Sequence, residues 1–276
     1  MRTDLATESR MQCKSMRGIR EETAYKSGLE ILRIDVLTEE ASQALDKPIG
    51  RYVSITMPPS FLMDRGARRL TANTLAKELS ALCGTVRNAL VIGLGNRYIT
   101  ADALGTKTAE NVLVTRHVHM HMKDLLPKNT PVVASFCANV LGVTGLETAE
   151  VVTALTEETR PGIVILIDSL AAMKPEHLGS LIQCNDSGIA PGSGVGNFQK
   201  TLTRERLGVP VVAVGIPLVV STDVFLGANA ETRAEDLIVT PKDIDAIVRD
   251  ASRVLSDALN LALFGDSYTE LEKILR

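Results

Sequence analysis

The sequence predicts a three-layer α/β/α fold around a mostly parallel or mixed twisted sheet. Two continuous apolar runs, at 89–94 and 162–167, are bounded by turn residues, a pattern typical of strands that are covered on both faces. Further strands are expected at 131–136 and 210–216, and helical patterns separate the strands. Such alternation predicts parallel strands with helices packed on both sides of the sheet.

Residues 1–28 are polar and are expected to be irregular, as many N-terminal segments are. Turn residues and period-two patterns then predict a small unit ahead of the first buried strand. Its expected elements are a strand at 31–37, a helix at 38–45 with Thr38 as its N-cap, and a strand at 51–57. Residues 29–276 are therefore expected to form one α/β domain, with 29–60 as a candidate accessory β-rich subregion.

The helices expected around the main sheet span 64–82, 105–114, 145–159, 173–182 and 241–263. The last has the clearest start, because Thr240 suits the N-cap, Pro241 suits the first helical position, and Asp243 follows in the first turn. Its apolar residues recur with helical spacing and predict one buried face. They are Ile244, Ile247, Val248, Ala251, Leu255, Leu259 and Leu263.

The composition limits the classes of function. Apolar residues make up 45% of the 276 positions, enough for a large core, which excludes a disordered chain. A net charge of −3 and only 3% aromatic residues argue against direct nucleic-acid binding and leave a basic protein as a candidate partner. No apolar run reaches the roughly 18–20 residues of a membrane span, and no signal peptide is recognisable. A cytoplasmic protein without membrane contact is therefore expected.

Two of the buried strands each lead to one aspartate. Asp102 follows the strand at 89–94 after a turn, and Asp168 comes directly after the strand at 162–167. Ligands of open α/β sheets bind beyond the carboxyl ends of the strands, so these two carboxylates can meet there. Two close carboxyls share a proton and supply a base and an acid that can activate water. The alternative is that each aspartate caps a helix or forms an ion pair.

Two glycine-rich segments are candidates for substrate binding. Gly93, Gly95 and Asn96 lie in a turn that lacks the third glycine of a dinucleotide fingerprint. We expect these glycines to let the backbone approach a substrate, with Asn96 as a donor. The segment 185–197 lacks the end of a phosphate loop and is consistent with either a substrate-binding lid or a plain surface loop. Its candidate substrate-binding residues are Asp186, Ser187, Gly192, Ser193 and Gly194.

Three alternating histidines, His117, His119 and His121, would share one face of an extended segment and could bind a metal ion there. An edge strand or loop with exposed imidazoles is the favoured interpretation. Accordingly, no metal site and no cofactor are expected.

Several segments resemble the germination protease (spore protease) family of endospore-forming bacteria. They follow one another in the family's order from residue 2 to about residue 220, which is more specific than any single motif. The matching segments are 2–6, 93–96, 100–105, 111–117, 142–148, 167–172 and 191–197.

The resemblance implies a phosphorylase/hydrolase-like fold related to the hydrogenase-maturation endopeptidases. It implies a sequence-specific endopeptidase that initiates degradation of small acid-soluble, DNA-binding spore proteins during germination. The family's two catalytic aspartates fall on Asp102 and Asp168, and the family assembles as homotetramers in the spore core. Two alternatives are a metal-dependent peptidase that uses both aspartates and a histidine as ligands, and a non-catalytic binding or assembly protein on the same fold.

The resemblance also implies a zymogen that trims its own N-terminus. The matching bond is Asp4–Leu5, which leaves a pro-segment of residues 1–4. Our hypothesis is that residues 1 to about 20 lie near the cleft and hinder access to it.

Overall fold

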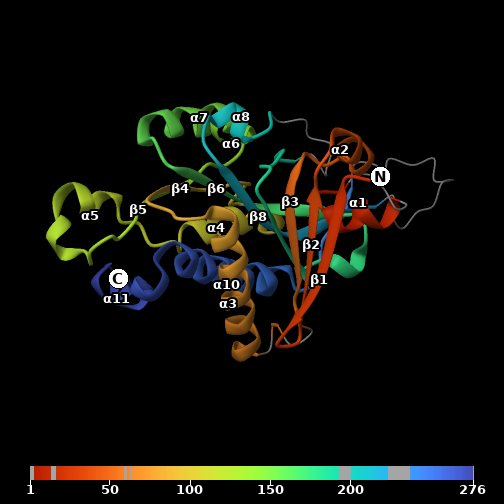
Figure 1. Ribbon diagram of the computed structural model, residues 1–276, viewed down its shortest axis with the longest axis horizontal. Coiled ribbons are helices and arrows are strands. Elements are labelled where there is room, and N and C mark those ends of the chain that lie inside the picture. The colour runs from red at the N-terminus through yellow and green to blue at the C-terminus, as the bar shows by residue number, and fades with distance from the viewer. Residues whose placement is uncertain are drawn as a thin grey trace.

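The computed structural model describes residues 3–13, 17–58, 61–62, 64–192, 200–222 and 237–275. Its centre is a nine-stranded sheet with the order β1-β2-β3-β7-β8-β6-β4-β5, and β9 pairs with β8 (Figure 1). The strands are β1 Ile19–Lys26, β2 Leu29–Val36, β3 Gly50–Thr56, β4 Asn88–Gly93, β5 Val132–Cys137, β6 Ile163–Ala172, β7 Leu181–Asn185, β8 Val211–Ser221 and β9 Ile238–Val239.

The sheet is mixed. Neighbouring strands are parallel from β8 through β6 and β4 to β5. They are antiparallel from β8 through β7, β3 and β2 to β1. The predicted α/β class is therefore confirmed, and the segment 29–60 contributes β2 and β3 to the same sheet by pairing with β7.

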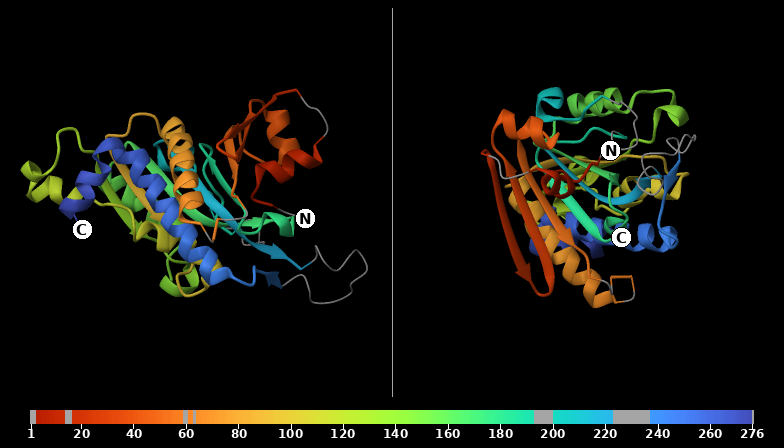
Figure 2. Two further views of the ribbon diagram at one scale, coloured as in Figure 1. Left: turned by 90° about the horizontal axis from the view of Figure 1, so that it is seen from below. Right: turned by 90° about the vertical axis from the view of Figure 1, so that its right-hand side faces the viewer.

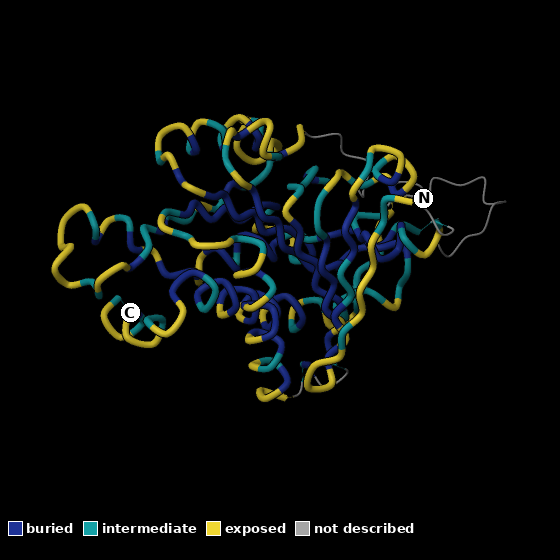
Figure 3. Tube along the Cα trace, in the orientation of Figure 1, coloured by how far each residue is buried: buried dark blue, intermediate teal, exposed yellow. Residues whose placement is uncertain are grey.

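Helices cover both faces of the sheet, as the alternating pattern predicts (Figures 1 and 2). One face packs against α3, α10 and α4, and the opposite face packs against α7 and α8. The strands between them are the most deeply buried part of the chain (Figure 3). The helices are α1 Ala6–Gln12, α2 Glu39–Leu45, α3 Arg65–Cys83, α4 Leu104–Ala109, α5 Arg116–His121, α6 Leu141–Thr144, α7 Thr148–Thr159, α8 Arg204–Leu207, α10 Ile244–Phe264 and α11 Tyr268–Leu275.

The helices that the sequence predicts most clearly are stabilised by a capping residue or by one buried apolar face. The Thr38 side chain accepts a hydrogen bond from the Ala41 N–H at the start of α2, as expected. The predicted face of α10 is confirmed, because its predicted apolar residues from Ile247 to Leu263 are all buried and Ile244 packs against the same core. However, α10 begins at Ile244 rather than near Pro241. Because β9 pairs with β8 up to Val239, residues 240–243 are needed to connect β9 to α10.

One predicted helix was wrong, and two others are present with shorter bounds. The helix expected at 173–182 is instead a 3₁₀ turn, η3 (Pro175–His177), followed by β7, whose residues are buried between β3 and β8. The helix expected at 105–114 ends at Ala109. The helix expected at 145–159 begins at Thr148, because Gly145 takes a left-handed conformation after the short α6.

The N-terminal region is also more ordered than expected. Within 1–28, α1 and β1 replace the predicted irregular chain. The first half of α1 is buried although it is largely polar, and its partners come from distant parts of the sequence. Tertiary contacts therefore determine the structure of this region, and no local sequence pattern predicts it.

Within the part of the chain that the structure describes, none of the helices combines the length and apolarity needed to cross a bilayer.

Candidate active site

A pocket with an empty volume of about 900 Å³ opens beyond the carboxyl end of β4 and beside the last residues of β6. Asp102 and Asp168 both line it, together with Gly95, Ser169 and Gly192. The carboxyl ends of parallel strands are where α/β sheets bind their ligands. Both aspartates therefore line one pocket, although Asp168 lies within β6 and not after the strand as expected.

Asp168 lies within β6, which continues to Ala172 because β8 pairs with it that far. Its side chain is only 4% exposed, and one carboxylate oxygen accepts a hydrogen bond from the Ser169 N–H at 2.8 Å. Burial raises the pKa of Asp168 well above its ordinary value, and the negative charge of Asp102 raises it further. The Ser169 hydrogen bond opposes these effects, and the charge of Asp4 adds to them.

Asp102 ends the 3₁₀ turn η1 (Thr100–Asp102), and its Oδ2 accepts a hydrogen bond from the Asn96 N–H at 2.7 Å. Burial raises the pKa of Asp102, and this hydrogen bond opposes the increase. Gly95 fixes the turn because it has a φ of +89°, and a Cβ there would lie 2.0 Å from the Asp102 carbonyl oxygen. Only glycine therefore lets the 93–96 turn pack against Asp102.

Gly93 has a packing role of its own. A Cβ on Gly93 would lie 2.3 Å from the carbonyl oxygen of Gly105, so its absence brings α4 against the end of β4. Gly93 is not one of the described residues that line the pocket, whereas Gly95 is. Asn96 contacts the site through its backbone N–H, which donates to the Asp102 carboxylate. That Gly93, Gly95 and Asn96 bind substrate stays a prediction.

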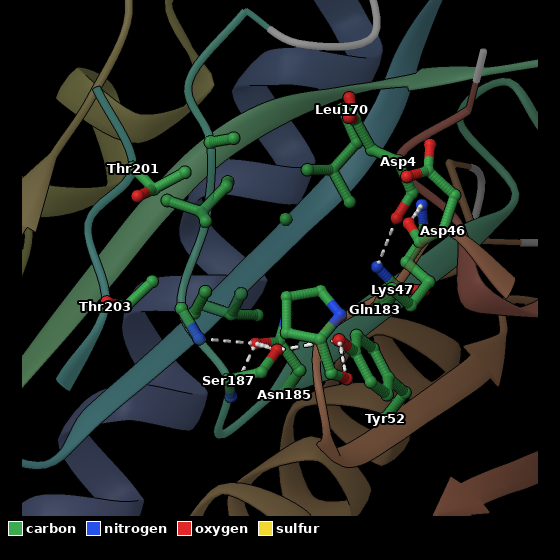
Figure 4. Close-up of a pocket in the computed structure, with 17 residues that line it drawn as sticks. Asp4, Asp46, Lys47, Tyr52, Leu170, Gln183, Asn185, Ser187, Thr201 and Thr203 are labelled. Atoms are coloured by element: carbon green, nitrogen blue, oxygen red, sulfur yellow. Dashed lines mark hydrogen bonds between the residues drawn. The ribbon is translucent and has the colours of Figure 1, made fainter. Parts of the chain in front are cut away.

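The predicted loop residues fall in different places. Gly192 lines the pocket that holds the aspartates, and Ser193 and Gly194 lie outside the described residues. Ser187 lines the neighbouring pocket, where its hydroxyl lies 2.8 Å from the Tyr52 hydroxyl (Figure 4). The Asp186 side chain accepts a hydrogen bond from the Arg51 N–H at 2.7 Å. The structure therefore brings only part of the predicted set to the aspartates.

The three histidines do not lie in an extended segment or an edge strand, because they form part of α5. Helical geometry turns His119 away from His117 and His121, so the face shared by all three is lost. His117 and His121 are exposed. Among the described residues, no group of three or more His, Cys, Asp or Glu side chains is arranged to hold a metal ion.

Asp4 connects the two pockets, since it lines both. Its N–H donates to the Ala171 carbonyl oxygen at 3.0 Å, and its Oδ2 accepts from the Ala171 N–H at 2.8 Å. Leu5 follows with no exposed surface and packs against Leu170 and Leu181. The Asp4–Leu5 bond therefore lies where the chain crosses the edge of the site.

Several residues at this crossing are ones that the sequence analysis missed. Gln183, from β7, hydrogen-bonds to Asp4 and Ala6, and the Lys47 ammonium donates to the Thr3 carbonyl oxygen at 2.8 Å. Glu8, a residue of α1, is fully buried, and His177 lies 2.7 Å from its carboxylate. Each of these contacts joins residues that are far apart in the sequence, so no local signal could have identified them.

Comparison with known proteins identifies the family. A family model described as germination protease matches residues 1–230. Germination proteases of Clostridium perfringens and Caldanaerobacter subterraneus are each 34% identical to this chain and align over 95% of it, covering 95% and 94% of their own lengths. The germination protease of Bacillus velezensis is 36% identical over 80% of this chain and 63% of its own length.

Among solved structures, a [NiFe] hydrogenase maturation protease, HycI from Thermococcus kodakarensis, is similar with a TM-score of 0.40 and 18% identity. It covers 67% of this chain and 98% of its own. The family match and the curated relatives span most of the sequence, including both strand-end aspartates. The chain therefore belongs to the germination protease family of peptidases.

Proposed function

We propose that this protein is a sequence-specific endopeptidase that initiates degradation of small acid-soluble, DNA-binding spore proteins, and that Asp102 and Asp168 activate the attacking water. The observation that carries the proposal is the shared pocket, in which burial and mutual charge raise the pKa of Asp168 and burial raises that of Asp102. Perturbed carboxyls in a cleft are typical of catalytic sites.

The two environments favour different roles. Asp168 is the more deeply buried and has the more strongly raised pKa, so it holds the shared proton. Asp102 keeps a hydrogen bond from the Asn96 N–H that favours its charged form, so it serves as the base. In this scheme Asp102 takes a proton from water, and Asp168 protonates the scissile amide. Asp102 then passes its proton to Asp168, and this transfer returns the pair to its starting state.

The protein is made, in this proposal, as a zymogen that cleaves its own Asp4–Leu5 bond. Support comes from the position of Asp4, which lines the pocket of the two catalytic aspartates. The chain downstream of the bond is firmly anchored, because Leu5 and Ala6 are fully buried. Cleavage would therefore release residues 1–4 and leave α1 in place.

We further propose a homotetramer that acts in the spore core. The edge strand β5 exposes Phe136. The adjoining α5, η2 (Lys123–Leu125) and the residue between them expose Met120, Leu125 and Met122. Apolar side chains grouped in this way are common at subunit interfaces. Light scattering of the purified protein would measure the mass directly, and a monomer at micromolar concentration would contradict the assembly.

The function is tested with Asp102→Asn and Asp168→Asn. The purified variants are incubated alongside the wild type, and intact mass reports loss of residues 1–4 while a peptide from a spore protein reports cleavage in trans. We expect each substitution to lower both rates at least about 10³-fold, since the paired groups act as a unit. Near wild-type activity in either variant would refute the assignment.

A further inference from the structure

The residues around the Asp4–Leu5 bond are held as an extended peptide between the ends of β6 and β7. Asp4 pairs with Ala171 through its N–H and its carboxylate. Lys47 holds the preceding carbonyl oxygen, that of Thr3, at 2.8 Å. Leu5 is buried in an apolar cluster formed with Leu170 and other residues of β6 and β7. The bond is thus fixed on both sides before α1 begins.

One side chain contacts the backbone on both sides of Leu5. Gln183 is 3% exposed, its Nε2 donates to the Asp4 carbonyl oxygen at 2.9 Å, and its Oε1 accepts from the Ala6 N–H at 2.7 Å. In Figure 4 the Gln183 side chain points from β7 toward Asp4. The Ala6 N–H can only donate and the Asp4 carbonyl can only accept, so these two partners fix which end of the amide faces Asp4.

We propose that Gln183 stabilises the oxyanion that forms on the Asp4 carbonyl oxygen when the protein cleaves its own Asp4–Leu5 bond. The proposal rests on the proposed function. Water oxygen bonds to the Asp4 carbonyl carbon, and the carbonyl oxygen takes up negative charge opposite the Gln183 N–H. The C–N bond then breaks, and the Leu5 nitrogen takes a proton from the aspartate pair. The products are an Asp4 carboxyl group and a Leu5 amine, and Gln183 exchanges no proton.

The site suits this role. The Gln183 donor is already aimed at the reacting oxygen, so no reorganisation is required when the charge develops. Gln183 is nearly fully buried, and an N–H donor in such a site stabilises a developing charge more strongly than one in water. Removing one donor of this kind typically lowers the rate about 10²–10³-fold.

The sharpest test is Gln183→Glu. The ionised glutamate still accepts from the Ala6 N–H but presents a negative oxygen to the Asp4 carbonyl, so processing should be at least about 100-fold slower than wild type at neutral pH. A protonated glutamate has a hydroxyl that can donate to Asp4. The ratio of variant to wild-type rate should therefore rise as the pH falls toward 5. A merely structural role for Gln183 gives a ratio that only follows the fraction of folded variant, which urea unfolding measures at each pH.

Several titratable groups share the pocket with Gln183 and are present in both proteins, so the ratio removes their common effect. They are Asp4, Asp46, Lys47 and Tyr52. Gln43→Glu, on the exposed surface of α2, adds the same charge away from the bond and should process at the wild-type rate. Gln183→Met, which has no charge and no donor, should remain slow at every pH.

Folding of each variant is checked by urea unfolding. If Gln183→Glu is unstable at neutral pH, the measurements in acid still test the proposal, because the protonated glutamate can make both hydrogen bonds. Processing within threefold of wild type in Gln183→Glu at neutral pH, or in Gln183→Met, would overturn the proposal. A ratio that is independent of pH, or that only follows the folded fraction, would also overturn it. If wild-type protein never loses residues 1–4, or if Asp168→Asn loses them at the wild-type rate, the proposed function fails as well.

Discussion

At the scale of single residues, the site combines side chains that are costly to bury. Asp168 lies among apolar residues of β6, and its carboxylate accepts a hydrogen bond from the adjacent Ser169 N–H. The Ser169 hydroxyl is buried and has no hydrogen-bond partner among the described residues. Buried polar groups without full compensation lower the free energy of unfolding, and such groups concentrate where a protein does chemistry.

Asp168→Asn should therefore raise the free energy of unfolding at pH 7 by about 1–3 kcal/mol. The folded state holds the Asp168 proton more tightly than the unfolded state, because its pKa is raised. The wild type thus loses stability as the pH rises from about 4, the unfolded value, through the folded pKa. The advantage of the variant should shrink as the pH falls toward 4. Urea unfolding at several pH values measures it, with the exposed Asp124→Asn as control.

Gly95→Ala should disrupt both the turn and Asp102. The positive φ of Gly95 disfavours any side chain, and the new Cβ would collide with the Asp102 carbonyl oxygen. We expect a loss of at least about 2 kcal/mol in stability and about 10²-fold in peptidase rate. Gly142→Ala is a matched control, because nothing lies within 4 Å of its Cβ position. Equal behaviour of the two variants would contradict this explanation.

At the scale of elements, the open edge of β6 creates the site. β4 ends at Gly93, opposite Ile167, while β8 continues beside β6 to Ala172. The edge of β6 beyond Ile167 is therefore not covered by β4, and Asp4 pairs with Ala171 on it. An exposed strand edge is a natural place for an extended peptide to bind.

The docking of α1 depends on Glu8. Its carboxylate accepts hydrogen bonds from the N–H groups of Met173 and Lys174 at 2.7 and 2.8 Å, and contacts His177. Burial by itself raises the pKa of Glu8, but the hydrogen bonds from His177, Thr3 and these two N–H groups together lower it. Glu8→Gln turns an amide donor toward groups that also donate, and should cost about 1–3 kcal/mol at pH 7.

The pH dependence of this loss has a definite sign. A lowered pKa gives stability that is present above the unfolded value, about 4.3, and is lost as the pH falls through the folded value. The difference between wild type and Glu8→Gln should therefore disappear in acid. Urea unfolding at pH 7 and pH 3 measures it, and Glu157→Gln on the exposed side of α7 should change neither value.

The sequence predicts some of these elements and misses others for physical reasons. The continuous apolar runs of β4 and β6 and the periodic face of α10 are strong local signals, and both aspartates follow from the strands. In contrast, β7 is short and contains the buried polar residues Gln183 and Asn185. Gln183 is satisfied by the distant Asp4 and Ala6, and Asn185 by N–H groups of the turn that follows it. Like Gln183, Glu8 has distant partners. A polar residue with a distant partner looks like a surface residue in the sequence.

At the scale of the whole molecule, the N-terminal segment and the pocket of the two aspartates form one unit. Residues 3–12 lie across the ends of β6 and β7 and are anchored on both sides of the proposed cleavage site. The proposed function therefore predicts that the segment before Leu5 competes with a substrate for the same edge. In the proposed function, the protein's own N-terminal segment is the first peptide that it cleaves.

A chain that begins at Leu5 should therefore be more active in trans. We expect its kcat/KM on a spore-protein peptide to exceed that of the unprocessed chain at least tenfold, which corresponds to about 1.4 kcal/mol of internal competition. The comparison uses full-length protein with Gln183→Met, to prevent processing, and the Leu5 chain with the same substitution. Equal rates in the two chains would show that residues 1–4 do not restrict access.

The central claim is that two carboxyl groups act as one catalytic unit, and a double-mutant cycle tests it most directly. The measurement is kcat/KM on one peptide for wild type, Asp102→Asn, Asp168→Asn and the double variant. We predict that each single substitution removes nearly all activity and that the double variant is no slower than either single one. Independent, additive losses, or a single variant that retains substantial activity, would contradict it.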